Sequence, residues 1–125
     1  MQKLMFESSW NKALSDKDRN AIEKTFLETS KINNDTIQLT PLWKAFNHKG
    51  ELLVTVLIHN FTEHSFSLDG TKLRYSVNNE ILAEHSFTRP LLAIQAKYSM
   101  PWTFIFPKEK LDKKLSHENG LLEII

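Results

Sequence analysis

The sequence predicts a mainly β protein, an immunoglobulin-like antiparallel β-sandwich of about six or seven strands with an N-terminal helix packed on it. Three observations lead to this fold class. Apolar and polar residues alternate with a period of two after residue 36, turn residues recur at short intervals, and no helical pattern separates successive strands. Because parallel strands need a crossover connection between them, usually a helix, this pattern favours antiparallel pairing.

A helix is predicted over residues 16–29, ahead of the strands. Ser15 is a favourable N-cap, because its hydroxyl can accept a hydrogen bond from a free amide of the first turn. The acidic residues Asp16 and Asp18 then suit the positive end of the helix dipole. Together these three residues fix where the helix begins.

The apolar face of this helix is narrow. Ile22 and Phe26 lie four residues apart and share one face, which is too little to stabilise an isolated helix. The helix must therefore pack against another element. Trp10, Ala13 and Leu14 precede the cap and extend the same patch, with Leu14 in the position of a hydrophobic staple.

The first strands are predicted from the alternation that begins at Ile37. Pro41 lacks an amide hydrogen, so it indicates an edge strand or a strand that breaks at that point. A turn is expected at residues 47–50, where Gly50 tolerates positive φ. Residues 52–60 are apolar on both faces, as expected of the central strand of a sheet.

A hairpin is predicted in the middle of the chain. Residues 73–77 alternate between apolar and polar, and Asn78 and Asn79 then favour a tight turn because asparagine enters the left-handed region readily. The second strand of the hairpin is expected over residues 81–87. A short strand at residues 66–68 precedes the hairpin.

Two more breaks in the strands are predicted, a turn at Asp69 and Gly70 and a loop that holds Arg89 and Pro90. A last long strand begins near Met100. It places three aromatic rings on one face, where we expect the densest part of the core: Trp102, Phe104 and Phe106.

The C-terminal tail admits two interpretations. Leu111 and Leu115 are spaced for one short helix after Pro107, whereas residues 121–125 suit either a last strand or a frayed end. The expected organisation is then a single domain over residues 1–125, which divides into a helical segment (1–30), a β-sandwich (36–107) and a tail (108–125).

The strand over residues 52–60 has an unusual outer face. Leu53 and Leu57, together with Phe61, point away from the sandwich core, where such a strand normally carries polar groups. We expect the N-terminal helix to cover them, and a second copy of the chain is the alternative. If Trp10 is part of this cover, replacing it with alanine costs about 3 kcal/mol or more.

Composition narrows the functional classes. The chain has 125 residues, 16 basic against 15 acidic side chains, and no cysteine. The balanced charge argues against a nucleic-acid or anionic membrane partner, and the missing thiols exclude disulfides and cysteine-based metal sites. No secretory signal or membrane-spanning run is found, so we expect a cytoplasmic chain as given, without membrane insertion.

No catalytic constellation stands out, and we expect neither an enzyme nor a bound cofactor or metal. His59 and His64 are five apart, whereas a zinc motif on a helix places its histidines four apart, so a metal-dependent hydrolase is only a minor hypothesis. The serines that neighbour histidines lack any nucleophile motif: Ser65, Ser86 and Ser116. The three isolated glycines cannot build a phosphate-binding loop: Gly50, Gly70 and Gly120.

One set of ordered features resembles a known family. It begins with Trp10 and Leu14 ahead of a helix that ends near Phe26, and it closes with the motif Pro-Trp-x-Phe-x-Phe at residues 101–106. The structural signature comprises Trp10, Phe26, Gly50, Asn60, Pro101, Trp102, Phe104 and Phe106. With these residues, the chain is similar to the SLAP domain, the module of S-layer-associated proteins and of assembly proteins in an accessory Sec export system of Gram-positive bacteria.

The resemblance implies a non-enzymatic module that binds a protein partner in the export or assembly of surface-layer or cell-envelope proteins. Either an exposed strand edge or the outer apolar face then makes the contact. A carbohydrate- or small-ligand-binding sandwich at the cell envelope is the alternative. The family supplies no catalytic residues to this sequence.

Overall fold

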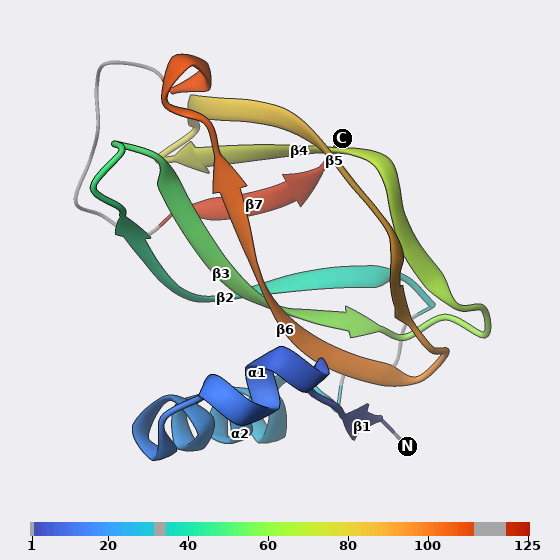
Figure 1. Cartoon of the computed structure of the whole chain (residues 1–125). Coiled ribbons are helices and arrows are strands. Elements are labelled where there is room, and N and C mark those ends of the chain that lie inside the picture. Colours follow the sequence, from blue (N-terminus) through green and yellow to red (C-terminus); the bar gives the residue numbers. More distant parts are fainter. Residues whose placement is uncertain (1, 32–34, 112–119) are drawn as a thin grey trace.

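The computed structural model describes residues 2–31, 35–111 and 120–125, and for residues 90 and 91 it describes the backbone only. It is the predicted sandwich of two sheets, with strand orders β1-β6-β3-β2 and β5-β4-β7 (Figure 1). The strands are β1 (Lys3–Leu4), β2 (Ile37–Phe46), β3 (Leu52–Asn60), β4 (Phe66–Val77), β5 (Glu80–Ile94), β6 (Tyr98–Phe106) and β7 (Leu121–Ile124). All pairs are antiparallel except β1 with β6, which is parallel.

Two helices precede the sandwich, α1 (Ser8–Ala13) and α2 (Asp16–Thr29). The bounds of α2 are the predicted ones, and Ser15 caps it by accepting a hydrogen bond from the amide of Asp18 at 3.1 Å. The sequence did not predict α1. Leu14 lies between the two helices as the C-cap residue of α1, because its amide donates to the carbonyl of Trp10.

The helices pack against the β1-β6-β3-β2 sheet, on the side away from the other sheet (Figure 1). Ile22 of α2 is fully buried, as are Leu57 and Phe61 on the outer face of this sheet. The prediction that the N-terminal helix covers this face is therefore confirmed, since α2 contacts β3 and Phe26 lies beside His59 on the same face. Among the described helices, none is both long and apolar enough to cross a membrane.

The strand β3 is central in its sheet, as predicted, and pairs with β2 on one side and β6 on the other. The strand β2 lies at the edge, and its register shifts between Pro41 and Trp43, so the proline both occupies an edge strand and marks a bulge. The turn between the two strands places Gly50 at φ +78°. These three predictions are confirmed.

The hairpin between β4 and β5 is also confirmed, with Asn78 at φ +52° and Asn79 at φ +68°. The predicted turn at Asp69 and Gly70 is wrong. These two residues form an irregularity within the continuous strand β4, where the amide of Gly70 donates to the hydroxyl of Thr88 at 3.0 Å.

The predicted loop at Arg89 and Pro90 is also wrong, because β5 runs through it to Ile94. The only named strand with which β5 pairs is β4, so the other edge of β5 has no partner strand. A proline lacks an amide hydrogen, and at a position that faces this free edge it costs the sheet no hydrogen bond. In the tail, a 3₁₀ turn (Lys108–Lys110) follows Pro107, and the last residues form β7 beside β4. The helix expected to include Leu115 lies outside the described residues.

The core lies between the two sheets. Phe104 and Phe106 are buried there, as predicted, and Phe87 of β5 meets both rings edge-on at 5.0 and 5.3 Å between centroids. Trp102 is only half-buried, so its expected place in the densest part of the core is corrected to the rim. There it stacks on Trp10 of α1, with 6.2 Å between ring centroids.

Candidate functional site

A fully buried histidine lies beneath the helices. His59 of β3 is packed between the rings of Phe26 and Phe61, 6.4 and 5.0 Å away between centroids. Its Nε2 is 2.7 Å from the hydroxyl of Thr29 on α2, and its Nδ1 is 2.6 Å from the hydroxyl of Ser99 on β6. The imidazole therefore joins the helix to two neighbouring strands.

The hydrogen bonds around His59 form one directed chain. Thr29 donates its only hydroxyl proton to the carbonyl of Thr25 at 2.7 Å, so it must accept from Nε2 of His59. Nδ1 is then an acceptor, and Ser99 donates to it while accepting from the amide of Gln2 at 3.1 Å. Every member is satisfied with a neutral imidazole.

Burial also keeps His59 neutral. Desolvation lowers its pKa from 6.5 to about 4, because the charged imidazolium loses water that the apolar rings around it do not replace. At neutral pH the ring holds the helix to the sheet through hydrogen bonds and stacking. It does not serve as a base open to solvent, since both its nitrogens are engaged and it has no exposed surface.

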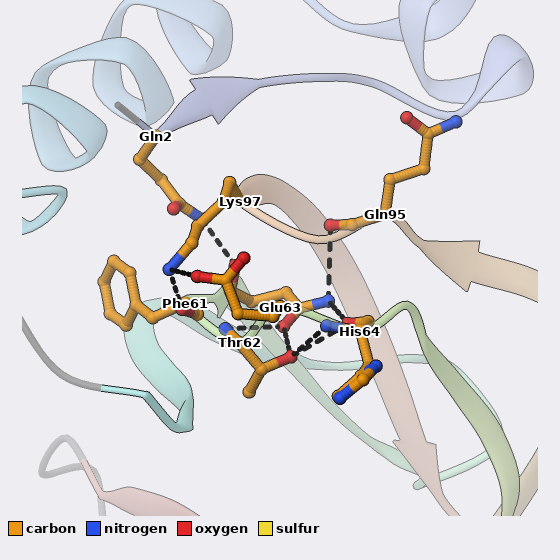
Figure 2. A network of polar contacts seen from close by, with 8 residues as sticks. Gln2, Phe61, Thr62, Glu63, His64, Gln95 and Lys97 are labelled. Carbon is orange, nitrogen blue, oxygen red and sulfur yellow. Dashed lines mark hydrogen bonds and ion pairs between the residues drawn. The ribbon is translucent and has the colours of Figure 1, made fainter.

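A second polar junction surrounds Asn60, the next residue along β3, which is also fully buried. Its side-chain amide donates to the carbonyls of His64 and Ile94 at 2.8 and 2.9 Å, and its side-chain oxygen accepts from the amide and hydroxyl of Thr62. The carbonyl of Gln95 also accepts from Asn60, and Figure 2 shows that the Gln95 side chain itself points away. One asparagine thus ties the β3–β4 turn to the β5–β6 turn.

Lys97 closes this junction from the β5–β6 turn. It lies at φ +65°, its ammonium donates to the carbonyl of Phe61 at 2.6 Å, and it is 3.2 Å from the carboxylate of Glu63 (Figure 2). Gln2 reaches the same place from the N-terminus and donates to the carbonyl of Asn60 at 3.0 Å. The junction is built to hold loops together, since nearly all of its polar atoms are paired with one another.

The structure separates the two histidines considered for metal binding, while Ser116, one of the serines that neighbour histidines, lies outside the described residues. His64 is exposed on the turn after β3, while both nitrogens of His59 are already hydrogen-bonded, so the two imidazoles offer no shared ion site. Within the described residues, no cluster of three or more histidine, aspartate or glutamate side chains has the arrangement of a metal site. Ser99, which the sequence analysis missed, contacts His59 but is fully buried.

The eight signature residues fall into two groups. Phe26, Asn60 and Pro101 belong to the helix-covered end of the molecule, with Trp10 and Trp102 stacked at its margin. Phe104 and Phe106 fill the core and Gly50 makes the β2–β3 turn. Most of this set therefore serves packing and loop junctions.

A groove of about 210 Å³ lies between β5 and β6. Its floor is apolar, with Leu68 and Phe104 buried and Phe87 and Trp102 half-buried. Its rim carries the remaining lining residues: His85, Ser86, Thr88, Arg89, Thr103 and Ile105. This volume is below the roughly 300 to 1,000 Å³ of typical small-molecule sites, so the groove suits a side chain or two rather than a whole ligand.

Within the described residues, the parts of β5 and β6 that border the groove pair with no other strand on that side, and the bridge between Ala83 of β5 and Leu111 lies outside the groove lining. β5 is the outermost strand of its sheet, and β6 pairs with β1 only at Tyr98 and Ser99. Sequence reasoning did not find this groove, because its two walls are about 15 residues apart in the chain and meet only after the sheets stack. Unpaired strands of this kind are ready to hydrogen-bond another chain.

Comparison with known proteins agrees with the resemblance noted in the sequence. The model of the SLAP domain family matches residues 4–121, nearly the whole chain. No curated protein and no solved structure matched the chain. On the strength of a family match that spans both the helices and the sandwich described above, the chain belongs to the SLAP domain family of S-layer-associated modules.

Proposed function

We propose that this chain is a non-catalytic protein-interaction module that acts as an accessory factor in the export or assembly of surface-layer or cell-envelope proteins. The observation that carries the proposal is the groove between β5 and β6, where each strand has an edge that pairs with no other strand among the described residues. Strand edges bind polypeptides through main-chain hydrogen bonds, which suits a factor that handles a protein cargo. Membership of the SLAP domain family supports the association with surface layers.

Two further features favour binding over catalysis. His59, whose pKa is lowered by burial, is hydrogen-bonded on both nitrogens and has no exposed surface, so it has no route to a substrate. The outer apolar face was the second contact surface expected from the sequence, and α2 covers it at Leu57 and Phe61. The open strand edges are therefore the better candidates for contact with a partner.

The test is co-purification from the native host, with the tagged chain crosslinked before lysis and the captured material identified by mass spectrometry and glycan analysis. We expect export or surface-layer polypeptides. Recovery of glycan without a stable polypeptide partner would instead favour the carbohydrate-binding alternative and contradict the proposal.

A matched pair of variants shows whether the groove makes the contact. Ser86 and Ser67 are both exposed serines on neighbouring strands, but only Ser86 lines the groove. Ser86→Lys should reduce capture of the partner at least severalfold, because it places a long charged side chain at the rim. Ser67→Lys makes the same chemical change away from the groove and should leave capture unchanged.

A further inference from the structure

We propose that the outward edge of β6 at Thr103 and Ile105 binds an extended, acidic segment of the partner polypeptide by β-strand addition. This inference rests on the proposed function and specifies the conformation, the charge and the docking strand of the partner. It commits to a peptide strand, as opposed to a folded surface, as the partner that lies along β6 and places a side chain or two in the groove between β5 and β6.

The direction of the β6 backbone follows from its pairing with β1. The amides of Lys3 and Met5 donate to the carbonyls of Lys97 and Ser99 at 3.0 and 2.9 Å, so the odd-numbered residues of β6 turn their backbone groups away from β3. The register between β3 and β6 runs without a shift as far as Phe106. The amides and carbonyls of Thr103 and Ile105 therefore also point outward.

These outward groups have no strand to pair with in the part of the chain that the structure describes. Pro101 fits the same pattern, since its missing amide lies at an outward position and costs no bond to β3. The same edge already accepts an extended segment at Tyr98 and Ser99, where β1 lies. A partner strand at Thr103 and Ile105 would continue an interface that the chain itself has begun.

The opposite edge of the sheet is a poor alternative. The edge strand β2 contains Pro41 and a shift of register beside it, two features that protect strands against added partners. The register of β6 with β3 runs without a shift from Ser99 to Phe106, and the proline of β6, Pro101, precedes the segment proposed to bind the partner. Of the two edges of this sheet, the β2 edge is therefore irregular, and the β6 edge is regular.

The groove beside β6 defines the chemistry of the added strand. Alternate side chains of that strand would face the apolar floor formed by Trp102, Phe104 and Phe87. Arg89 is exposed at the rim, is the one side chain of full charge among the lining residues, and makes no ion pair with any described residue. An acidic residue flanking an apolar one in the partner is complementary to this arrangement.

The experiment uses the full chain and two labelled synthetic peptides that alternate valine with polar residues. One peptide carries glutamates among its polar residues, and the other carries lysines in the same places. We expect the acidic peptide to bind more tightly and to slow hydrogen exchange at the amides of Thr103 and Ile105. The Arg89→Glu variant should reverse the preference between the two peptides.

A proline variant tests the main-chain contact. Ile105→Pro removes an outward amide and leaves the ladder to β3 in place, so the acidic peptide should bind about tenfold more weakly than to Ile105→Ala, which retains the amide. If the proline variant does not fold, N-methylation of the peptide gives the same test with the native chain. Methyl groups on one edge of the peptide should abolish binding, and methyl groups on the other edge should not.

Failure of this inference is distinct from failure of the proposed function. Exchange that slows at β2 or β5 only, or no change at Thr103 and Ile105 with the acidic peptide, would overturn strand addition at β6. If a polypeptide is nevertheless captured from the native host, the proposed function stands while the docking mode is wrong. If no polypeptide is captured, the proposed function itself is wrong.

Discussion

The outer face of the β1-β6-β3-β2 sheet has two halves that differ in their cover. Beneath α2, the side chains of Leu57, His59 and Phe61 are fully or almost fully buried. Further along the same face, Ala45, Leu53 and Ile105 form a row in register across three strands, and Ile105 is 45% exposed. The same sheet thus combines a sealed half with an open one.

The polar groups of the two halves follow this difference. In the sealed half, both ring nitrogens of His59 are hydrogen-bonded within the protein, and the adjacent Asn60 is satisfied by the neighbouring turns, because a buried polar group without a partner is costly. In the open half, the backbone groups at the β6 edge can remain unpaired since water satisfies them. The sealed half therefore provides stability, and the open half is available to a partner.

The largest expected effect is at Asn60. Asn60→Ala removes one donor group shared by three carbonyls and one acceptor shared by two donors, so we expect a loss of about 4 kcal/mol in the free energy of unfolding. Chemical denaturation measures this loss. Gln95→Ala is the control, because that side chain points away from the junction and its removal should cost less than about 0.5 kcal/mol.

The seal itself is tested on α2. Ile22→Ala opens a cavity between helix and sheet, so it should lower the free energy of unfolding by about 3 kcal/mol. Leu27 lies on the same helix but is 66% exposed, and Leu27→Ala should change stability by less than about 0.5 kcal/mol. Equal effects of the two substitutions in thermal or urea unfolding would show that α2 does not seal the sheet.

The buried histidine makes the sealed half sensitive to acid. The pKa of His59 is lowered from its ordinary value of 6.5, which the unfolded chain retains, to about 4 in the folded protein, so between these values only the unfolded chain binds the proton. Stability is then complete above pH 6.5 and falls by about 3 kcal/mol as the pH drops to 4. Unfolding measured at several pH values should show this loss.

Substitution assigns the acid sensitivity to one residue. His59→Gln should remove that contribution from the pH profile, since glutamine does not titrate. His64→Gln is the matched control, because His64 is exposed on the following turn and should leave the profile unchanged. A wild-type profile in the His59 variant would contradict our account of the buried chain of hydrogen bonds.

Trp10 lies at the boundary between the two halves. The sequence alone suggested a cost of about 3 kcal/mol or more for Trp10→Ala, as for a core residue. Because the ring is half-buried and stacks on Trp102, we expect about 2 kcal/mol instead. Denaturation of the Trp10→Ala and Trp102→Ala variants and of the double variant measures the coupling between the two rings, and additive losses would show that the stack contributes nothing.

The smallest effect is expected in the open half. Ile105→Thr keeps a β-branched side chain at an exposed strand position, so the free energy of unfolding should change by less than about 0.5 kcal/mol. A loss comparable to that of Ile22→Ala would mean that Ile105 is part of the packed structure and that this half is not open.

Much of the fold was predictable because its signals are local. The cap at Ser15, the two asparagines of the hairpin and the apolar run of β3 each act within a few residues, and all three were found where expected. The errors arose where tertiary contacts override a local signal. A glycine such as Gly70 indicates a turn when the local sequence is considered alone. In the structure, β4 stays paired with β5 on both sides of Gly70, so the residue lies in a bulge within β4.

The candidate site was much less predictable. The burial of His59 and its contact with Ser99 depend on the register between β3 and β6 and on the position of α2. The groove between β5 and β6 depends on how the two sheets stack. Neither property is encoded in the spacing of residues along the chain.

The sequence by itself determined α2, most of the strands, the mainly β class and the family, because capping, alternation and turn chemistry are properties of short segments. The tertiary structure alone decided which polar groups are sealed and which strand edge is left open. Burial and pairing depend on what a residue meets from distant parts of the chain, so the same kind of strand is closed at His59 and open at Ile105.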